Sequence, residues 1–383
     1  MTGHSLIPIG SWLEPKYDRS GSSKSMSGGM NKNENADARV AEGYDIPAVE
    51  AWIDANTAYF KPPFSWTRLE GGHSNLTYRL EDQSGKRAVI RRPPMGELLP
   101  KAHDMNREWS LIAAFAPQGF PVPEPIGFCE DLSITGALFY VMGFSEGRPL
   151  FSNEDTLSWV PESQRATLAY SFIDTLADMH VLDPDAIGLS GLGKKEDYVG
   201  RQIKAWYRSW ESSIAYAELD DSRAHDFKDY FLIHQPEQVR ASVVHGDYYL
   251  HNCLFGQNSR VSAVLDWELA TLGDPLADLG YTLRAWPESA DDAHLEPTAP
   301  TAVPGFPFRA ELAQRYAERT GFSVDLLDYY VGFNNWKTAA ILHGVYARYR
   351  AGQKSTEGVD MDGLREGILK ALNGAERAIQ RLG

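Results

Sequence analysis

Short runs of alternating hydrophobic and polar residues fill the chain from about residue 64 to residue 144, and such alternation is typical of strands. The runs WTRLEGG, TYRLED and RAVIRR follow one another, and QSGK between the last two suits a tight turn. A further β-prone run, ITGALFYVMGF, ends the region. Apolar residues recur at helical spacing only within KAHDMNREWSLIAAFAP. The pattern predicts a small antiparallel sheet with one main helix over residues 38–144.

Helical periodicity dominates the rest of the chain. In PESQRATLAYSFIDTLADMHVL the apolar stripe consists of Leu168, Phe172, Leu176 and Met179. Comparable patterns cover residues 197–217, 222–234, 308–320, 324–350 and 361–381. Two short apolar runs, ASVVHG and VSAVLDWE, are expected to be buried strands with polar residues at their ends. The prediction is an α+β protein whose second, mostly helical part spans residues 145–383.

The composition is that of a globular protein. The 383 residues are 43% hydrophobic and 23% charged, which is enough apolar material for two parts that each have a core. Residues 1–37 are instead rich in Gly, Ser, Asn and Lys. Because this segment could bury little apolar surface on folding, we predict a disordered tail there.

Charge and cysteine content narrow the function classes. The formal net charge is −15, from 37 basic and 52 acidic residues, which argues against a nucleic acid or an anionic membrane as partner. No apolar run approaches the roughly 20 residues that span a bilayer, and the N-terminus does not resemble a secretion signal. Cys129 and Cys253 form neither a disulfide framework nor a metal-binding spacing. We therefore predict a cytoplasmic protein without a membrane partner.

The segment VVHGDYYLHNCLF, residues 243–255, concentrates polar residues between apolar flanks. Phosphoryl transfer to an alcohol needs an aspartate that orients or deprotonates the hydroxyl, together with an amide and a carboxylate that hold magnesium on the phosphates. Asp247, Asn252 and Asp266 supply this set, and Gly246 permits an unusual backbone turn beside it. These residue types fit phosphoryl transfer from a nucleotide to an alcohol, and the resemblance described next implies that the protein uses ATP and Mg²⁺ and acts on a small-molecule hydroxyl.

The spacing H-x-D-x-x-x-x-N, followed by LDW, resembles the catalytic and metal-binding segments of the protein-kinase-like superfamily. HGD and LDW are similar to the aminoglycoside phosphotransferase and choline kinase-like family. LDWELATLGDPLADLGY, RRPP, AHDMNREW, PVPEPIGFCED and FYVM further resemble the kinase-like domain fused to some acyl-CoA dehydrogenases. The resemblance covers roughly residues 45–375 and implies a bilobal fold with an N-lobe and a helical C-lobe.

The resemblance also implies residue roles in the C-lobe. Asp247 is expected to be the catalytic base, with Asn252 and Asp266 as magnesium ligands. His245 corresponds to a position that supports the geometry of the loop, and we expect structural roles for Asp274 and Asp278. His251 has no comparable assignment.

In the N-lobe, the turn EGGHSNLTY is expected to approach the phosphates through Gly71, Gly72, Ser74 and Asn75. The segment AVIR stands where these kinases usually have V-A-I-K, so the resemblance assigns Arg91 to the position of the phosphate-binding lysine. The replacement keeps the positive charge but changes its geometry.

Two further positions follow from the resemblance. Glu108, in the helix after the third strand, is the expected partner of Arg91. Adenine is expected to bind the main chain near Met142, Gly143 and Phe144.

The sequence is compatible with more than one acceptor and with more than one kind of activity. The resemblance favours a hydroxyacyl-CoA, whereas the acid-rich segment 266–296, with its single arginine, would suit an aminoglycoside or an amino alcohol. Because Arg91 replaces lysine, a kinase-like protein that binds nucleotide or metabolite without turnover is an alternative. A rival enzyme would use H-x-D and a distant histidine such as His343 as an iron-binding triad. The oligomeric state is not predicted.

Overall fold

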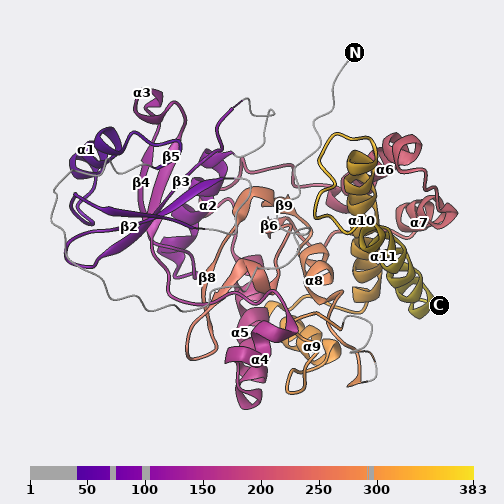
Figure 1. Ribbon diagram of the computed structural model, residues 1–383. Coiled ribbons are helices and arrows are strands. Elements are labelled where there is room, and N and C mark those ends of the chain that lie inside the picture. The colour runs from indigo at the N-terminus through magenta and orange to yellow at the C-terminus, as the bar shows by residue number, and fades with distance from the viewer. Residues whose placement is uncertain (1–40, 70–74, 97–103, 291, 293–296) are drawn as a thin grey trace, which may run out of the picture. The chain divides into compact units, whose positions relative to one another are not determined.

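The computed structural model describes residues 41–69, 75–96, 104–290, 292 and 297–383, and Figure 1 draws them as ribbons. Contacts divide the chain into two compact units. The first comprises Met1–His103, Ile126–Val141 and Glu357–Asp360, and the second comprises Asp104–Pro125, Met142–Thr356 and Met361–Gly383. The predicted tail and three of the expected phosphate-binding residues, Gly71, Gly72 and Ser74, lie outside the described residues.

A five-stranded sheet has the strand order β1-β2-β3-β5-β4. Its strands are β1 (Ser65–Arg68), β2 (Leu76–Glu81), β3 (Arg87–Arg92), β4 (Pro125–Cys129) and β5 (Phe139–Gly143). The first three form the predicted antiparallel meander, in which Tyr78 of β2 lies opposite both Arg68 of β1 and Ile90 of β3. Buried and partly buried residues alternate along β2, as the sequence pattern predicts for a strand with one face in a core.

The core of the first unit lies against helix α1 (Ile46–Asn56), which the sequence analysis did not predict. Its start is well defined, because the side chain of Asp45 accepts a hydrogen bond from the Ala48 N–H and a proline occupies the first turn. Val49 and Ile53 of α1 are fully buried in the same hydrophobic cluster as the sheet residues. A short helix, α3 (Leu132–Thr135), completes the unit.

The second unit is mostly helical. Its helices are α2 (Met105–Phe115), α4 (Asn153–Trp159), α5 (Glu162–Val181), α6 (Tyr198–Ala217), α7 (Ser222–Ile233), α8 (Pro275–Leu283), α9 (Arg309–Thr320), α10 (Leu327–Arg350) and α11 (Met361–Arg381), with short 3-10 turns η1 (Ala116–Gln118), η2 (Leu250–Asn252) and η3 (Trp267–Leu269). Every helix predicted after residue 145 is confirmed, and α10 and α11 pack side by side (Figure 1). The α+β class is thereby confirmed. Among the described residues, no helix is both long and apolar enough to cross a membrane.

Two small antiparallel sheets carry the loops of chemical interest. One pairs β6 (Ser242–Val244) with β9 (Thr271–Gly273), and the other pairs β7 (Cys253–Phe255) with β8 (Val261–Val264). The predicted strands ASVV and VSAV are confirmed as β6 and β8, whereas their partners are short strands that the sequence analysis did not predict. The chain leaves β6, passes through the loop around His245, and enters β7.

Candidate active site

The loop between β6 and β7 depends on a glycine. Gly246 has a φ of +83°, and a β-carbon at this position would lie 3.0 Å from the carbonyl oxygen of Leu269. A side chain would therefore be strained by both the backbone conformation and the space available. The structure confirms the unusual turn expected at Gly246, which sets the direction in which the next residue leaves the strand.

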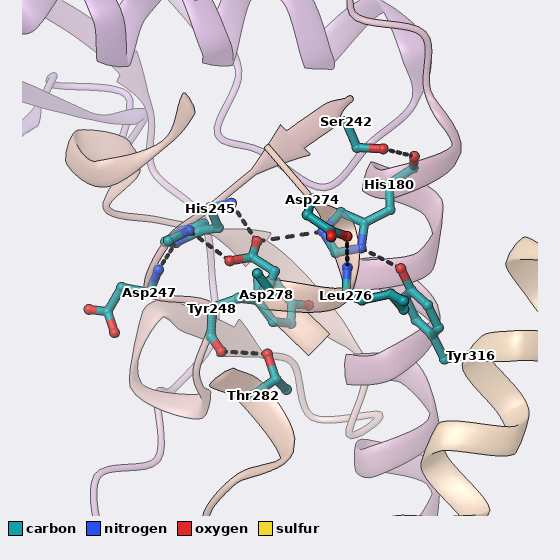
Figure 2. Close-up of polar contacts among 12 residues, drawn as sticks. His180, Ser242, His245, Asp247, Tyr248, Asp274, Leu276, Asp278, Thr282 and Tyr316 are labelled. Carbon is teal, nitrogen blue, oxygen red and sulfur yellow. Dashed lines mark hydrogen bonds and ion pairs between the residues drawn. The ribbon is translucent and has the colours of Figure 1, made fainter. Parts of the chain in front are cut away.

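His245 connects this loop to the segment that precedes Asp266. Its imidazole is fully buried and packs on the ring of Trp267, with ring centroids 4.8 Å apart. Nε2 lies 2.9 Å from the carbonyl oxygen of Leu265. Nδ1 accepts the main-chain N–H of Asp247 at 3.3 Å (Figure 2). Since the carbonyl must be approached by a donor, the contacts fit a neutral imidazole with its proton on Nε2.

Asp278, in the first turn of α8, holds the main chain of the same loop. Its Oδ2 accepts the N–H of His245 at 2.5 Å, and its Oδ1 accepts the N–H of Gly246 at 2.9 Å. On the same helix, the hydroxyl of Thr282 donates to the carbonyl oxygen of Tyr248 at 2.9 Å (Figure 2). Helix α8 therefore fixes the loop on both sides of Asp247.

The carboxylate of Asp278 is itself surrounded by polar groups. Nε2 of His180, on α5, lies 3.5 Å from Oδ2, and the other ring nitrogen of His180 lies 2.7 Å from the hydroxyl of Tyr316 on α9 (Figure 2). Burial alone would raise the pKa of Asp278, but His180 and the loop lower it below the usual range. Burial lowers the pKa of His180. An ionised Asp278 beside a neutral His180 is the pairing that these shifts support.

Asp274 is the N-cap residue of α8, and its side chain makes contacts that stabilise the fold. Its Oδ1 accepts the N–H of Leu276 at 3.0 Å, and its Oδ2 accepts the hydroxyl of Tyr330 at 2.8 Å. Burial raises the pKa of Asp274 to about 6. Both oxygens are thus used to start the helix and to contact α10.

Asp247 projects from the loop with only 7% of its surface exposed. Oδ1 accepts a short hydrogen bond from the hydroxyl of Tyr281, and Oδ2 accepts the side-chain amide of Asn252 at 3.1 Å. His251 Nε2 lies 3.8 Å from Oδ2. Burial alone would raise the pKa of Asp247, but the contacts with His251 and Tyr281 lower it overall. The carboxylate is therefore ionised at neutral pH and can accept a proton.

Asn252 and Asp266 lie on chain segments that pair directly. The N–H of Leu265 donates to the carbonyl oxygen of Asn252 at 2.8 Å, which brings the residue before Asp266 alongside Asn252. Asn252 Nδ2 also donates to the carbonyl oxygen of Asp247 at 2.9 Å, so Oδ1 is the side-chain atom that would face a cation. Asp266 has a φ of 64°, a left-handed conformation that is uncommon outside glycine and tends to occur at functional sites.

The donor chemistry of this pair fits magnesium. Mg²⁺ takes one or two protein carboxylates and fills its other positions with phosphate and water oxygens. Asn252 and Asp266 offer one amide oxygen and one carboxylate on neighbouring segments. Within the described part of the chain, no group of three or more His, Cys, Asp or Glu side chains is arranged to hold a metal ion. Because two protein ligands leave positions for phosphate and water oxygens, the pair suits an ion that is shared with a phosphate ligand.

The structure separates the two arginines of β3. Arg91 lies opposite Thr77 in the sheet and is partly buried. Arg92, on the other face, donates from Nη1 to the carbonyl oxygens of Gly43 and Thr135, the latter at 2.8 Å. Arg92 is thus part of the structural core of the first unit, and Arg91 keeps its assignment as the candidate phosphate ligand.

The other expected nucleotide residues lie as follows. Asn75 is 2% exposed, and so is Glu108, which is therefore not a solvated surface carboxylate on α2. Arg91 and Glu108 belong to different compact units, and their contact stays a prediction. Met142 is buried, and the N–H of Gly143 donates to the carbonyl oxygen of Glu124 at 2.8 Å. The expected adenine contact of residues 142–144 would therefore involve main-chain groups other than this N–H.

His343 does not join His245 and Asp247. Its ring nitrogens lie 2.7 Å from the hydroxyl of Ser213 and 2.7 Å from the carbonyl oxygen of Leu219, and its ring stacks on Trp210. The iron-binding triad is wrong for this histidine, because both of its nitrogens are occupied by contacts with α6 and the residues after it.

Sequence reasoning missed Tyr281 and His180 as neighbours of the loop, and it gave no role to His251, which lies within the loop. A signal was available for Tyr281, because it follows Asp278 by three positions and therefore shares its helix face. His251 follows Asp247 by four positions in the same loop, whereas for His180 we find no comparable local signal. The ring of His251 stacks on that of Phe151, with centroids 6.0 Å apart, while its Nε2 faces Asp247.

An Asp278→Asn variant is expected to lose about 3 kcal/mol of unfolding free energy, because an amide cannot accept both loop N–H groups and leaves buried polar groups without partners. Since the folded pKa of Asp278 lies below its unfolded value, the contribution of its charge is present at neutral pH and is lost progressively below about pH 4. Urea unfolding of both proteins at pH 7 checks the value.

The matched control is Asp174→Asn, which removes the same charge from a partly exposed pair with Arg315. Because solvent screens such a pair, the control should lose about 1 kcal/mol or less. Equal losses in the two variants would contradict the role given to Asp278.

Known proteins are similar to this chain in sequence. The model of the phosphotransferase enzyme family matches residues 65–321. Acyl-CoA dehydrogenase family member 11 of Rattus norvegicus is 32% identical over 329 residues, which make up 82% of this chain and 41% of that protein. The chain thus spans about two-fifths of the length of this relative.

Two solved structures extend the likeness to the fold. A protein from Ralstonia eutropha JMP134, classed with the aminoglycoside phosphotransferases, has a TM-score of 0.74 and 30% identity, over 88% of this chain and 99% of its own. A thermostable mutant of aminoglycoside phosphotransferase APH(4)-Ia, in a ternary complex with ADP and hygromycin B, has a TM-score of 0.52 and 14% identity, over 87% and 98%. At that identity the second likeness concerns the fold alone.

Proposed function

Because the chain belongs to the phosphotransferase enzyme family, we propose that it is a kinase that uses ATP and magnesium to phosphorylate a hydroxyl group of a small molecule. The observation that carries the proposal is Asp247, a buried and ionised carboxylate held beside Asn252 in a loop that α8 fixes. A protein of this family that only binds its ligands would not need a base in this position.

The proposed reaction follows from the two oxygens of Asp247. Oδ1 accepts the hydroxyl of Tyr281 and Oδ2 accepts the amide of Asn252, and each oxygen of an ionised carboxylate has a further lone pair that can accept the acceptor hydroxyl. The hydroxyl oxygen forms a bond with the γ-phosphorus as the bond from that phosphorus to the ADP oxygen breaks, and the hydroxyl proton passes to Asp247. The products are a phosphate monoester and ADP. Asn252 and Asp266 would hold Mg²⁺, which supplies positive charge to the phosphate oxygens.

The nucleotide contacts are carried over from the family. We propose that Arg91 binds phosphate oxygens and that Glu108 orients it, with the turn that ends at Asn75 over the phosphates and residues 142–144 at the adenine. Arginine can hold phosphate through two parallel hydrogen bonds, which makes it a suitable replacement for lysine. His245 is proposed to brace the loop, since both of its ring nitrogens are used within it.

For the acceptor, we propose a hydroxyacyl-CoA or a related hydroxy acid. Support comes from the relative named acyl-CoA dehydrogenase family member 11, which this chain matches over about two-fifths of that protein's length. An aminoglycoside or amino alcohol is the second candidate, in line with the neighbour that binds ADP and hygromycin B. Both free cysteines are buried thiols, in keeping with the reducing, cytoplasmic location that we propose.

A panel of acceptors tests this function, with ADP release as the readout under constant Mg²⁺. Hydroxyacyl-CoAs, aminoglycosides and amino alcohols are compared in parallel, each against a reaction without acceptor. We expect ADP release to increase with the hydroxyacyl compounds and to require Mg²⁺. Nucleotide binding without acceptor-dependent ADP release across the whole panel would favour the alternative, a protein that binds nucleotide or metabolite without turnover.

A further inference from the structure

A buried lysine lies close to the proposed catalytic residues. Lys337, on α10, is only 9% exposed, and within the described part of the chain it has no hydrogen bond or ion pair. Its Nζ lies 5.9 Å from the centre of the Tyr281 ring. A lysine that merely stabilised the fold would be expected to pair, because an ammonium group without a partner is costly to bury.

A second cation lies over the same aromatic ring. The guanidinium carbon of Arg284 is 4.0 Å from the centre of the Tyr281 ring and 6.0 Å from that of Tyr249. Arg284 Nη1 donates to the carbonyl oxygen of Tyr281 at 2.7 Å, which holds the side chain against the helix end. The hydroxyl of Tyr281 donates to Asp247. One aromatic side chain thus contacts the catalytic carboxylate at its tip and two cations at its ring.

The two helices that carry these groups are closely packed. Helices α8 and α10 approach so closely that a β-carbon on Gly280 would lie 2.6 Å from the β-carbon of Tyr330. The side chain of Asn334 on α10 donates to the carbonyl oxygen of Ala277 on α8 at 2.8 Å. Lys337 lies one helical turn beyond Asn334, so its position relative to Tyr281 is set by this packing.

The electrostatic surroundings of Lys337 are mixed. Burial lowers its pKa, the carboxylates of Asp278 and Asp247 oppose this effect, and Arg284 adds to it. Asp278 already accepts two main-chain N–H groups, and Asp247 accepts Tyr281 and Asn252. A negatively charged ligand beside Lys337 would therefore supply the partner that the protein does not.

We infer that Tyr281, Arg284 and Lys337 form an acceptor subsite that binds an anionic group of the alcohol whose hydroxyl faces Asp247. The inference rests on the proposed kinase function and deepens it, because it assigns the acceptor to the acidic alcohols. An amino sugar or amino alcohol would bring an ammonium group beside two cations, and like charges in a low-dielectric site repel strongly.

The acid-rich segment 266–296 does not oppose this assignment. Asp278 binds the catalytic loop, and Asp274 binds Leu276 and Tyr330, so neither carboxylate is directed at an acceptor. The single arginine of the segment, Arg284, is the residue that stacks on Tyr281. These two negative charges are therefore used inside the fold, whereas the positive charge of Arg284 lies at the subsite.

The test uses three acceptors with the same carbon skeleton: 3-hydroxybutanoate, 3-hydroxybutanamide and 4-amino-2-butanol. They carry a negative, a neutral and a positive group at the same distance from the hydroxyl. For the wild type we expect kcat/KM to fall in that order. In Lys337→Met the ratio of kcat/KM for the acid to that for the amide should fall about 10- to 100-fold, mainly through KM, and Lys337→Arg should recover part of it.

Equal losses of kcat/KM for all three acceptors would overturn the inference and assign Lys337 to the transferred phosphoryl group. A structural role is checked separately by thermal unfolding. Because methionine removes a buried charge without changing the volume much, Lys337→Met should have a Tm equal to or above that of the wild type. A clear fall in Tm would count against a ligand-binding role.

If the wild type phosphorylates none of the three acceptors, the proposed function fails for these compounds. The anionic subsite is then tested separately by a binding experiment. Butanoate and butylammonium, which lack a hydroxyl, are titrated into the full chain with Mg²⁺ and a non-hydrolysable ATP analogue. We expect tighter binding of butanoate by the wild type and loss of this preference in Lys337→Met. Equal binding of the two ions by the wild type would contradict the subsite.

Discussion

An Asp247→Asn variant is expected to lose about 1,000-fold in kcat for phosphoryl transfer while it keeps its fold. The amide has the shape of the carboxylate and can still accept the hydroxyl of Tyr281, but it cannot take the proton of the acceptor. The pKa of Asp247 lies below the usual range, so the wild-type carboxylate is ionised at neutral pH and no further deprotonation is needed there. Steady-state kinetics with an acceptor identified in the panel measure the loss.

The control for this variant is again Asp174→Asn, which removes a carboxylate from the partly exposed pair with Arg315. It should keep the kcat of the wild type. Binding of the non-hydrolysable ATP analogue to Asp247→Asn should be nearly unchanged. This result would show that the variant has lost the phosphoryl-transfer step and not nucleotide binding. A kcat close to that of the wild type in Asp247→Asn would show that another group accepts the proton.

An Asp266→Ala variant is expected to lose at least about 100-fold in kcat/KM, because the remaining amide of Asn252 is a weak magnesium ligand without a carboxylate beside it. The direct readout is the effect of Mg²⁺ on ADP binding, measured by calorimetry. The wild type should bind ADP more tightly with Mg²⁺ than without it, and the variant should show little difference.

The backbone at Asp266 requires a second variant. Its φ of 64° is unfavourable for alanine, whereas asparagine adopts this conformation more readily. Asp266→Asn therefore removes the charge with less strain, and it should also lose the magnesium-dependent part of ADP binding. If Asp266→Asn kept the full effect of Mg²⁺, the carboxylate would not be the ligand that we propose.

The long helices could be predicted from the sequence because each has one apolar face that repeats at the helical period. Helix α8 could not, since all nine of its residues are buried and no polar face marks the period. Strands β7 and β9 have three residues each, which is too short for alternation to be recognised. Their pairing with β6 and β8 depends on contacts between distant parts of the chain.

Some residues of the candidate site could likewise be predicted from the sequence, and others could not. Asp247 and Asn252 lie five positions apart in one loop, so their spacing carries a local signal. Tyr281 and Lys337 approach Asp247 only through the packing of α8 and α10, and no spacing along the chain encodes that contact. In the sequence Lys337 lies in the middle of α10 between Trp336 and Thr338, and nothing there distinguishes it from a solvated lysine. Its burial without a partner required the structure.

The central claim is that Asp247 directs the transfer of the γ-phosphoryl group of ATP to an acceptor hydroxyl. It is tested most directly by following the label from γ-³²P-ATP into acceptor phosphate monoesters, with the wild type and Asp247→Asn under the same Mg²⁺ concentration. We expect a labelled monoester from an acidic alcohol with the wild type and almost none with the variant. Label released only as inorganic phosphate, or equal labelling of the acceptor by both proteins, would contradict it.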